Sequence, residues 1–252
     1  MKVFPAIILI PLLASLGFQG QEKGIQVRWH GQSFFEILSP QGVRIVIDPH
    51  TIDNFGRKSV EADLVLVTHL HHDHTRLEAI SNKGKYKTVF GMKVDPETKR
   101  QDWNILDEKV KDVNIKTFGA YHDDSQGMRR GKTGIFLLDI AGVKLAHLGD
   151  IGHVPGNELV KSLGPVDILF IPVGGVYTVN GSDARATVDK IQPRRFAIPM
   201  HYGVKVFQDL LPIDEFLEDQ DKASIINHKN STITIPLEGK GSKPATLILG
   251  YE

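Results

Sequence analysis

The feature that most constrains this chain is a cluster of histidine and aspartate at the end of an apolar segment. Residues 64–67 read LVLV, which predicts a buried strand, and residues 68–75 follow directly as THLHHDHT. In open sheets, ligands and metal ions collect at the carboxyl ends of strands. A histidine-rich surface loop is the alternative, but the interleaved aspartate and the preceding strand favour a binding site.

The spacing within this cluster predicts ligands for a metal ion. His69 and His71 are two positions apart, so an extended segment points both imidazoles to the same side. Asp73 and His74 follow on an expected tight turn and add a carboxylate and a further imidazole. The chain has no cysteine, so only nitrogen and oxygen donors are available. These donors suit Zn²⁺ best, with Mn²⁺ and iron as alternatives.

The segment HLHHDH matches the HxHxDH signature, and from Gly24 to its C-terminus the chain resembles the metallo-β-lactamase superfamily. The resemblance is to the branch of broad zinc-dependent hydrolases that includes ascorbate-6-phosphate lactonase-like proteins. It implies an α+β fold, the four-layer αββα sandwich, in which two sheets pack face to face with helices outside. Relatives in the superfamily often carry a histidine where this chain has Gln32.

The resemblance also implies that seven residues hold two divalent metal ions. Three of them, His122, Asp150 and His201, follow later strands. One ion takes three imidazoles, the other takes one carboxylate and two imidazoles, and a second carboxylate bridges the pair. The expected groups are His69, His71 and His122; Asp73, His74 and His201; and the bridging Asp150.

Two such ions predict hydrolytic chemistry. A divalent ion lowers the pKa of water from about 15.7 toward about 7, and two ions hold the attacking and leaving oxygens. The expected protein is a hydrolase that uses a metal-bound hydroxide on an ester, lactone, amide or phosphodiester bond of a small-molecule substrate. Asp73 is expected to orient the attacking water as well. A non-enzymatic metal- or ligand-binding protein of the same fold and a true β-lactamase are the alternatives.

Four further residues are candidates near the expected site. Arg130 belongs to the basic segment QGMRRGKTG, and its guanidinium suits contact with an anionic substrate, whereas a solvated hairpin loop is the alternative. Tyr177, in a glycine-rich loop, is expected to line the pocket. His153 is a candidate catalytic residue for substrate contact or proton transfer. Asp48, at a strand end, is expected to form structural hydrogen bonds rather than to bind metal.

Composition limits the number of domains and the kind of partner. A chain of 252 residues with 41% hydrophobic content can bury one sizeable core, so residues 24–252 are expected to form one hydrolase domain. The 30 basic and 30 acidic residues cancel, which argues against a nucleic-acid partner.

Residues 1–20 predict a secretory signal peptide. Lys2 precedes the uncharged run VFPAIILIPLLASLGF, which is too short for an untilted membrane span and contains two prolines. Small residues at Ser15 and Gly17 suit a cleavage site. The mature protein is therefore expected to be exported, periplasmic or extracellular, with no stable membrane span after cleavage. A retained N-terminal membrane anchor is the alternative.

Patterns elsewhere predict mostly strands. Residues 25–29 and 34–38 alternate as an antiparallel pair, and the apolar run 168–172 predicts a strand buried on both faces. A short helix is expected over 76–80 and a longer one over 184–191, with Ser182 or Asp183 as its N-cap. The charged segment 93–111 predicts solvated helix and loop.

Overall fold

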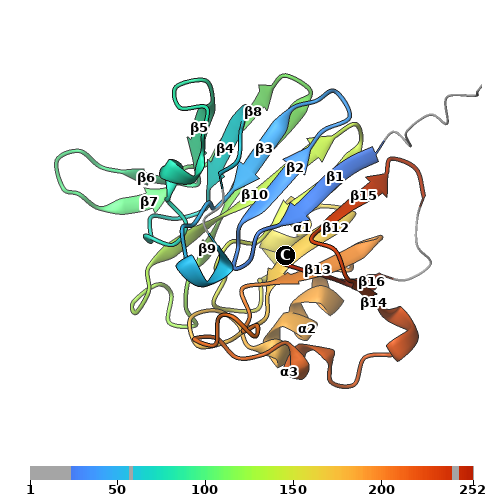
Figure 1. The fold of residues 1–252 in the computed structure, drawn as a ribbon. Helices are drawn as coiled ribbons and strands as arrows, with labels where there is room; N and C mark the ends of the chain where they lie inside the picture. Colours follow the sequence, from blue (N-terminus) through green and yellow to red (C-terminus); the bar gives the residue numbers. More distant parts are fainter. Residues whose placement is uncertain (1–23, 57–58, 240–243, 252) are drawn as a thin grey trace, which may run out of the picture.

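A computed structural model describes residues 24–56, 59–239 and 244–251. The expected signal peptide, residues 1–20, lies outside these described residues. Two mixed sheets pack face to face, and helices flank them (Figure 1). The predicted metallo-β-lactamase fold is therefore confirmed.

The first sheet has six strands and is antiparallel from β15 to β3 and parallel from β3 to β5. Its strands in spatial order are β15 (Thr232–Pro236), β1 (Gly24–Trp29), β2 (Phe35–Leu38), β3 (Arg44–Ile47), β4 (Leu64–Val67) and β5 (Lys87–Phe90).

The second sheet has eight strands and is antiparallel from β8 to β11 and parallel from β11 to β14. Its strands in spatial order are β14 (Ile225–His228), β16 (Ala245–Leu249), β13 (Phe196–Met200), β12 (Ile168–Pro172), β11 (Val143–His147), β10 (Lys132–Ile140), β9 (Val113–Tyr121) and β8 (Asp107–Val110).

The remaining elements of the described chain are short. They are the hairpin strands β6 (Met92–Val94) and β7 (Gln101–Trp103), the α-helices α1 (Asn157–Leu163), α2 (Gly181–Ile191) and α3 (Asp214–Leu217), and the 3₁₀ turns η1 (Asp53–Phe55), η2 (Leu77–Ala79) and η3 (Lys222–Ser224).

The main core lies between the two sheets. Strand β1 alternates buried Ile25, Val27 and Trp29 with more exposed residues, which is the period-two pattern of a strand with one buried face. Across the interface, Phe35 of β2 meets Phe170 of β12 with ring centroids 4.6 Å apart. Burying each of these large side chains contributes roughly 1.5–3 kcal/mol to folding.

A smaller core covers the outer face of the first sheet. Val65 and Val67 of β4 pack there with Ile80, just after η2, while Leu64 and Leu66 face the main core. Both faces of β4 are thus buried, as its unbroken apolar sequence predicts. The helix expected over residues 76–80 is a 3₁₀ turn.

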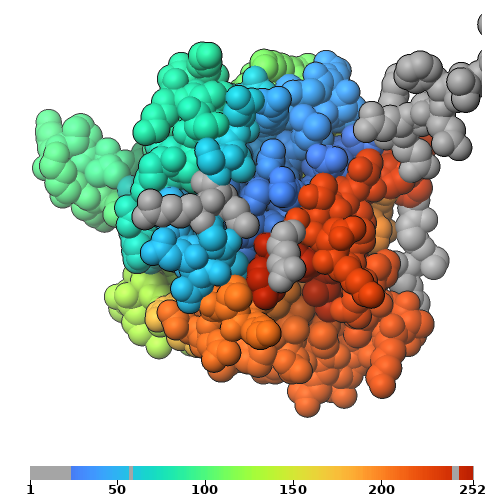
Figure 2. Space-filling model, viewed as in Figure 1, coloured from blue at the N-terminus to red at the C-terminus, as the bar shows by residue number. Residues whose placement is uncertain are grey.

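The helix predicted within residues 93–111 is wrong, because this segment contains strands joined by loops. Strands β6 and β7 form an antiparallel hairpin that projects from the body of the molecule, and β8 joins the edge of the second sheet (Figures 1 and 2). Contacts between strands stabilise this segment as strands. Lys93 lies opposite Asp102 in the hairpin, and Trp103 packs onto Gly119 of β9.

Helix α2 begins earlier than predicted. Its N-cap is Asn180, whose side-chain oxygen accepts a hydrogen bond from the Asp183 backbone N–H at 2.8 Å, so neither Ser182 nor Asp183 is the cap. The helix packs on the second sheet through Ala184, Thr187 and Ile191. Within the described residues, none of the helices combines the length and apolar character needed to span a bilayer.

Candidate metal centre

The histidine cluster follows β4 as predicted, and a buried aspartate beneath it fixes the first imidazole. Thr68 contacts Asp48 twice, through its backbone N–H and its hydroxyl, both at 2.7 Å. A carboxylate only accepts, so the single hydroxyl proton goes to Asp48. The 3.0 Å contact between the hydroxyl oxygen and His69 Nδ1 therefore requires the proton on Nδ1. This leaves the His69 Nε2 lone pair free to face the site.

Asp48 also orients His74. The His74 Nδ1 atom lies 3.1 Å from Asp48 Oδ2, and both side chains are completely buried. Because Nδ1 faces Asp48, the Nε2 atom of His74 faces the site. Carboxylates that hold metal-binding imidazoles in this way raise ligand basicity and fix the tautomer. The sequence prediction of a hydrogen-bonding role for Asp48 agrees with this geometry.

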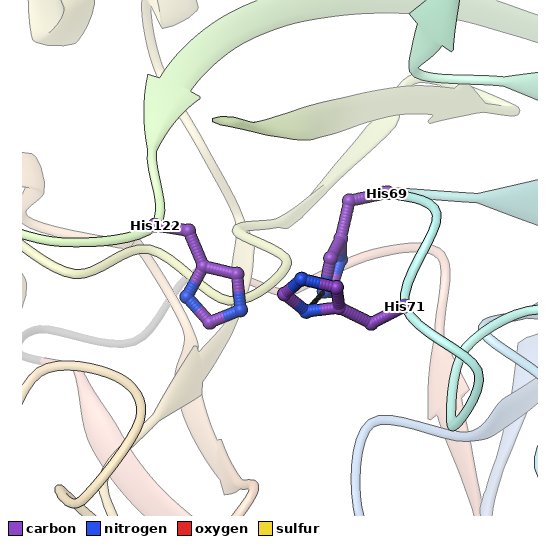
Figure 3. A group of neighbouring side chains, drawn as sticks. All are labelled: His69, His71 and His122. Atoms are coloured by element: carbon purple, nitrogen blue, oxygen red, sulfur yellow. Dashed lines mark hydrogen bonds between the residues drawn. The ribbon is translucent and has the colours of Figure 1, made fainter. Parts of the chain in front are cut away.

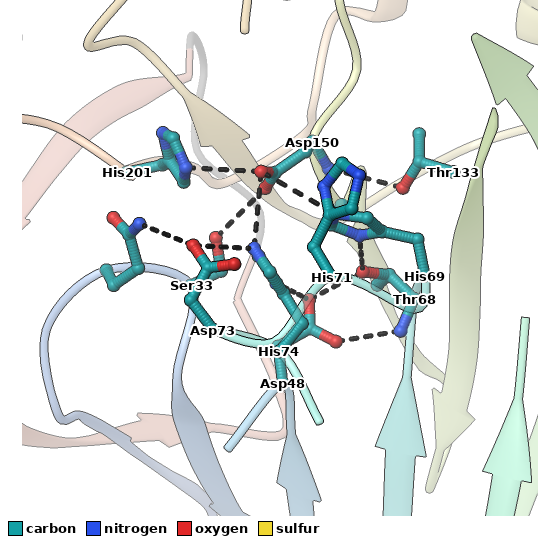
Figure 4. Close-up of polar contacts among 12 residues, drawn as sticks. Ser33, Asp48, Thr68, His69, His71, Asp73, His74, Thr133, Asp150 and His201 are labelled. Atoms are coloured by element: carbon teal, nitrogen blue, oxygen red, sulfur yellow. Dashed lines mark hydrogen bonds and ion pairs between the residues drawn. The ribbon is translucent and has the colours of Figure 1, made fainter. Parts of the chain in front are cut away.

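Asp150 lies at the centre of the site (Figure 4). It is buried, and its Oδ2 atom faces four imidazoles that come from three different places in the chain. The distances from Oδ2 to their Nε2 atoms are 3.1 Å for His201, 3.2 Å for His74, 3.5 Å for His122 and 3.9 Å for His69. A single carboxylate surrounded by imidazole nitrogens matches the expected bridging position.

Two groups of ligand atoms coincide with those that the resemblance implies, and a third brings Asp150 to His69 and His74. His69 and His71 face His122 across the first group (Figure 3), and His69 Nε2 lies 3.0 Å from His71 Nδ1. Within each group the ligand atoms all lie within 4.8 Å of one another. The groups are His69, His71 and His122; Asp73, His74 and His201; and His69, His74 and Asp150.

Burial and the neighbouring carboxylates shift the pKa values of these groups in different directions. Burial lowers the pKa of His69, His71 and His122, which keeps their imidazoles in the unprotonated form that binds metal. Burial alone lowers the pKa of His74 as well, but the charges of Asp150 and Asp48 outweigh it and raise that pKa well above its ordinary value.

The donor set therefore fits divalent ions. The ion-pair partners recorded for Asp150 among the described residues are all imidazoles, so no lysine or arginine ammonium or guanidinium group fills the place of a cation there. Nitrogen and oxygen donors without thiolates suit zinc, manganese or iron.

Strand direction explains why residues so far apart in sequence meet. Strands β9, β11 and β13 run the same way in the second sheet, so their carboxyl ends share one edge. His122, Asp150 and His201 follow these three ends. The first sheet contributes the cluster after β4 to the same edge.

Gly149 permits the close approach that Asp150 needs. Its φ is +55°, and an added Cβ would lie 2.5 Å from Thr133 Oγ1 and 2.8 Å from the Gly134 carbonyl oxygen. Neither contact is possible for a real side chain. The glycine is thus required by space as well as by backbone conformation.

An open cavity of about 510 Å³ gives access to this centre, and its size is typical of small-molecule sites. The predicted substrate residues Arg130 and Tyr177 both line it. Its other lining residues are Gln32, Ile52, His71, His72, Asp73, His122, Arg129, Asp150, His201, Phe207, Asp209 and Leu210.

Arg130 and Tyr177 contact each other at the rim of the cavity. The Arg130 guanidinium lies 5.3 Å from the Tyr177 ring centroid, and its Nη2 donates to the Val176 carbonyl oxygen at 2.9 Å. The backbone of Arg130 is fixed too, because its N–H donates to the buried carboxylate of Asp123 at 2.7 Å. The guanidinium therefore has a defined place beside the metal centre.

His153 is not among the residues that line the cavity. Its Nε2 accepts a hydrogen bond from the Tyr121 backbone N–H at 3.2 Å, and its Nδ1 lies 3.1 Å from the Val154 carbonyl oxygen. Both ring nitrogens thus hold the backbone beside His122. The catalytic role of His153 stays a prediction.

Sequence reasoning missed the contribution of the segment between β1 and β2. Gln32 and Ser33 hydrogen-bond to Asp73 and Asp150 respectively, each at 3.3 Å. These pairs are separated by 41 and 117 positions, so no local spacing signals them. The apolar part of the cavity wall, formed by Ile52, Phe207 and Leu210, was missed for the same reason.

The fold and the metal centre define the class: the chain belongs to the metallo-β-lactamase superfamily, and residues 26–201 match the family model described as a beta-lactamase superfamily domain. More narrowly, it belongs to the UPF0173 metal-dependent hydrolase family. A UPF0173 protein of Pyrococcus abyssi is 35% identical over 187 residues, which are 71% of this chain and 84% of that protein. A UPF0173 metal-dependent hydrolase of Thermococcus onnurineus is 31% identical over 193 residues, 71% of this chain and 85% of the relative.

A solved structure shares both the fold and part of the sequence. It comes from Thermotoga maritima and is assigned to the zinc-dependent hydrolases of the metallo-β-lactamase superfamily. The two chains superpose with a TM-score of 0.66 at 27% identity, covering 90% of this chain and 98% of the other.

Proposed function

We propose that this protein is a hydrolase that depends on two divalent metal ions, zinc being the best suited, and cleaves an ester, lactone, amide or phosphodiester bond in a small molecule. The observation that carries the proposal is Asp150 Oδ2, which four imidazole Nε2 atoms surround in the depth of an open cavity. The names of the relatives, metal-dependent hydrolases, support it.

Seven residues of this chain would hold the ions, in the groups described above. Bound there, the ions supply a water of lowered pKa and polarise the oxygen of the bond to be cleaved. Asp48 keeps the Nε2 atoms of His69 and His74 directed into the centre. Asp73 is half-buried and faces the cavity, so its carboxylate can also accept a hydrogen bond from the attacking water.

The cavity offers different chemistry on its different sides. Arg130 provides a cation whose position Val176 and Tyr177 fix, and a guanidinium suits a carboxylate or phosphate. Phe207 and Leu210 provide apolar surface. We therefore expect a substrate with an apolar part and a polar or anionic group that Arg130 contacts. The resemblance to ascorbate-6-phosphate lactonase-like proteins makes lactones the first class to test.

Metal removal tests the proposal. The zinc-loaded protein is assayed on a panel of chromogenic esters, lactones, phosphodiesters and β-lactams, before and after exhaustive chelation, with metal content measured by mass spectrometry. Hydrolysis should disappear with the metal and return with Zn²⁺ or Mn²⁺. Hydrolysis that continues at zero metal content would refute the mechanism. Turnover confined to β-lactams would instead make the protein a β-lactamase.

We also propose that the protein acts outside the cytoplasm, as its N-terminal sequence suggests. Mature protein isolated from the cell envelope or culture medium should begin between Phe18 and Lys23. N-terminal sequencing by mass spectrometry measures this directly. A soluble cytoplasmic protein that retains Met1 would rule out the export proposal.

A further inference from the structure

The turn between β1 and β2, residues Gly31–Ser33, is held in place by side-chain and backbone donors. Each of its three consecutive carbonyl oxygens accepts a hydrogen bond from a buried donor. His50 Nε2 donates to the Gly31 carbonyl at 3.1 Å, and His147 Nε2 donates to the Ser33 carbonyl at 3.3 Å. The Gln32 carbonyl accepts two hydrogen bonds, from Trp29 Nε1 at 2.9 Å and from the His201 backbone N–H at 3.1 Å. The turn is thereby tied to both sheets.

Two of these donors are neutral histidines with a defined tautomer. The Nδ1 atom of His50 accepts the Ile52 N–H, and that of His147 accepts the Gly149 N–H, both at 3.2 Å. Their Nε2 atoms must therefore carry the protons that the turn receives. Burial holds the pKa of His50 at about 4, so this arrangement persists at neutral pH.

The side chain of Gln32 is then directed at the metal centre. Its Nε2 donates to Asp73 Oδ2 at 3.3 Å, while its backbone carbonyl accepts the N–H of His201. One residue thus contacts two of the three ligands in the Asp73, His74 and His201 group. The left-handed backbone of Gln32, with φ of +53°, makes both contacts possible from the same position.

The other end of the Gln32 amide has no partner among the described residues. Because a carboxylate cannot donate, the amide nitrogen must face Asp73, and this fixes where the oxygen points. The Oε1 atom is buried without a hydrogen bond, and Gln32 lines the cavity. A buried acceptor without a hydrogen bond destabilises the fold, so an unpaired acceptor at a cavity indicates that a molecule bound there donates to it.

We propose that Gln32 positions Asp73 for the second metal ion and, through Oε1, accepts a hydrogen bond from an O–H or N–H group in the cavity. That donor belongs either to the substrate, beside the bond to be cleaved, or to the attacking water. The acceptor role rests on the proposed hydrolase function. The positioning role rests only on the metal centre.

Zinc titration tests the positioning role without any substrate. Metal-free wild type, Gln32→Met, Gln32→His and Gln101→Met are titrated with Zn²⁺ against a competing chelator. Gln32→Met keeps the length but loses both polar atoms, so one of the two ions should bind about 10–100-fold more weakly. Gln32→His, whose ring N–H can donate to Asp73, should restore much of that affinity. Gln101→Met, on the projecting β7, should match wild type. If Gln32→Met binds both ions as wild type does, or loses both equally, the positioning role is wrong.

A pair of small carboxylates tests the acceptor. Glycolate differs from acetate by one hydroxyl, and calorimetry measures the binding of both to wild type and Gln32→Met at saturating zinc. The hydroxyl of glycolate can also bind zinc, so the change in preference between the two proteins is the quantity measured. A substrate donor predicts that the preference of wild type for glycolate over acetate falls about 3- to 10-fold in Gln32→Met. If the attacking water is the donor, this preference is unchanged, and Gln32→Met hydrolyses every substrate of the panel at least about 10-fold more slowly with both ions bound.

The remaining outcomes contradict the acceptor role. The same preference for glycolate over acetate in wild type and Gln32→Met, together with unchanged hydrolysis per zinc-loaded Gln32→Met molecule, would eliminate it. A wild type that binds two zinc ions but hydrolyses nothing would refute the proposed function, and an unchanged preference in Gln32→Met would then by itself eliminate the acceptor. The zinc titration would still decide the positioning role.

Discussion

At the scale of single residues, Asp150 faces more of the expected ligands than any other side chain described above. Its Oδ2 faces the Nε2 atoms of His69, His74, His122 and His201. The surrounding imidazoles, His201 and His74 above all, hold its pKa well below the ordinary value although burial opposes this. The residue is therefore a carboxylate at all ordinary pH values, as a bridge between cations must be.

Asp150→Ala should abolish the bridge. Without its charge, two cations would repel each other with less compensation, so we expect metal content to fall to about one ion or less and hydrolysis to fall by about 10³-fold or more. Mass spectrometry and the substrate panel measure the two quantities. His228→Ala is the matched control, because His228 Nε2 contacts the Thr232 carbonyl oxygen and the residue neither lines the cavity nor belongs to a ligand group. Full metal content and full rate in Asp150→Ala would disprove the assignment.

Thr68→Val tests whether the hydrogen bonds that orient the expected ligand His69 contribute to metal binding. The substitution preserves shape but removes the hydroxyl that joins Asp48 to His69. Losing this buried link should weaken zinc binding about 10–100-fold and lower the free energy of unfolding by about 1–3 kcal/mol. Zinc titration and denaturant unfolding measure these changes. If Thr68→Val binds zinc as tightly as wild type, the Thr68 hydroxyl is not required to fix the tautomer of His69.

At the scale of elements, the loop of residues 123–131 depends on one buried carboxylate. Asp123 accepts four backbone N–H groups, from Ser125, Gly127, Arg129 and Arg130, at 2.7–2.9 Å. Although burial raises the pKa of Asp123, these four donors lower it to about 2. The loop connects His122 to the arginines at the cavity rim, so its shape matters to the site.

Asp123→Asn should destabilise the protein in a pH-dependent way. An asparagine has one acceptor oxygen instead of two, so we expect a loss of about 1–3 kcal/mol at neutral pH. The folded-state pKa is lower than the ordinary value of 3.8, so the carboxylate stabilises the fold above about pH 4 and loses this contribution as pH falls toward about 2. Denaturant unfolding of the metal-free proteins should therefore show a difference that shrinks below pH 4. The neighbouring Asp124→Asn, on an exposed side chain, should change stability little; a difference independent of pH would contradict the charge-based explanation.

The elements that the sequence predicted correctly are those decided by local pattern. Strand β4 is an unbroken apolar run, and β1 alternates with period two, so each could be found within a few residues. The hairpin of β6 and β7 was missed because its charged strands are stabilised by each other and by Trp103 packing onto Gly119, and neither contact leaves a periodic signal.

At the metal centre, too, residues signalled by local sequence pattern were predicted, and those defined by contacts made on folding were not. The seven expected ligands follow strand ends and a known motif, so sequence and resemblance together located the residues that the structure gathers into these clusters. Gln32 and Ser33 act through hydrogen bonds across 41 and 117 positions, which exist only once the sheets have packed. The contacts of His153 with the backbone of Tyr121 and Val154 are likewise set by folding rather than by spacing.

At the scale of the whole molecule, the metal centre joins the two sheets. The cluster after β4 belongs to the first sheet, whereas His122, Asp150 and His201 follow strands of the second. Ions bound by ligands from both sheets bind the folded state far better than the unfolded chain. Metal binding should therefore contribute to the stability of the entire fold and not only to activity.

Thermal unfolding measures this contribution. Zinc at 100 times its dissociation constant should raise the free energy of unfolding by about 2.7 kcal/mol per ion, so the Tm should rise with zinc concentration and return to the metal-free value after chelation. Mg²⁺ at the same concentration should have little effect, because the site is rich in imidazole, whereas Mg²⁺ prefers oxygen ligands and retains its water. The double variant His71→Ala with His201→Ala removes one ligand from the His69, His71 and His122 group and one from the Asp73, His74 and His201 group. The two residues follow strands of different sheets. Zinc should stabilise this variant much less than wild type. An equal rise in Tm for both proteins would mean that zinc stabilises the fold from another place, and the link between the sheets would have to be abandoned.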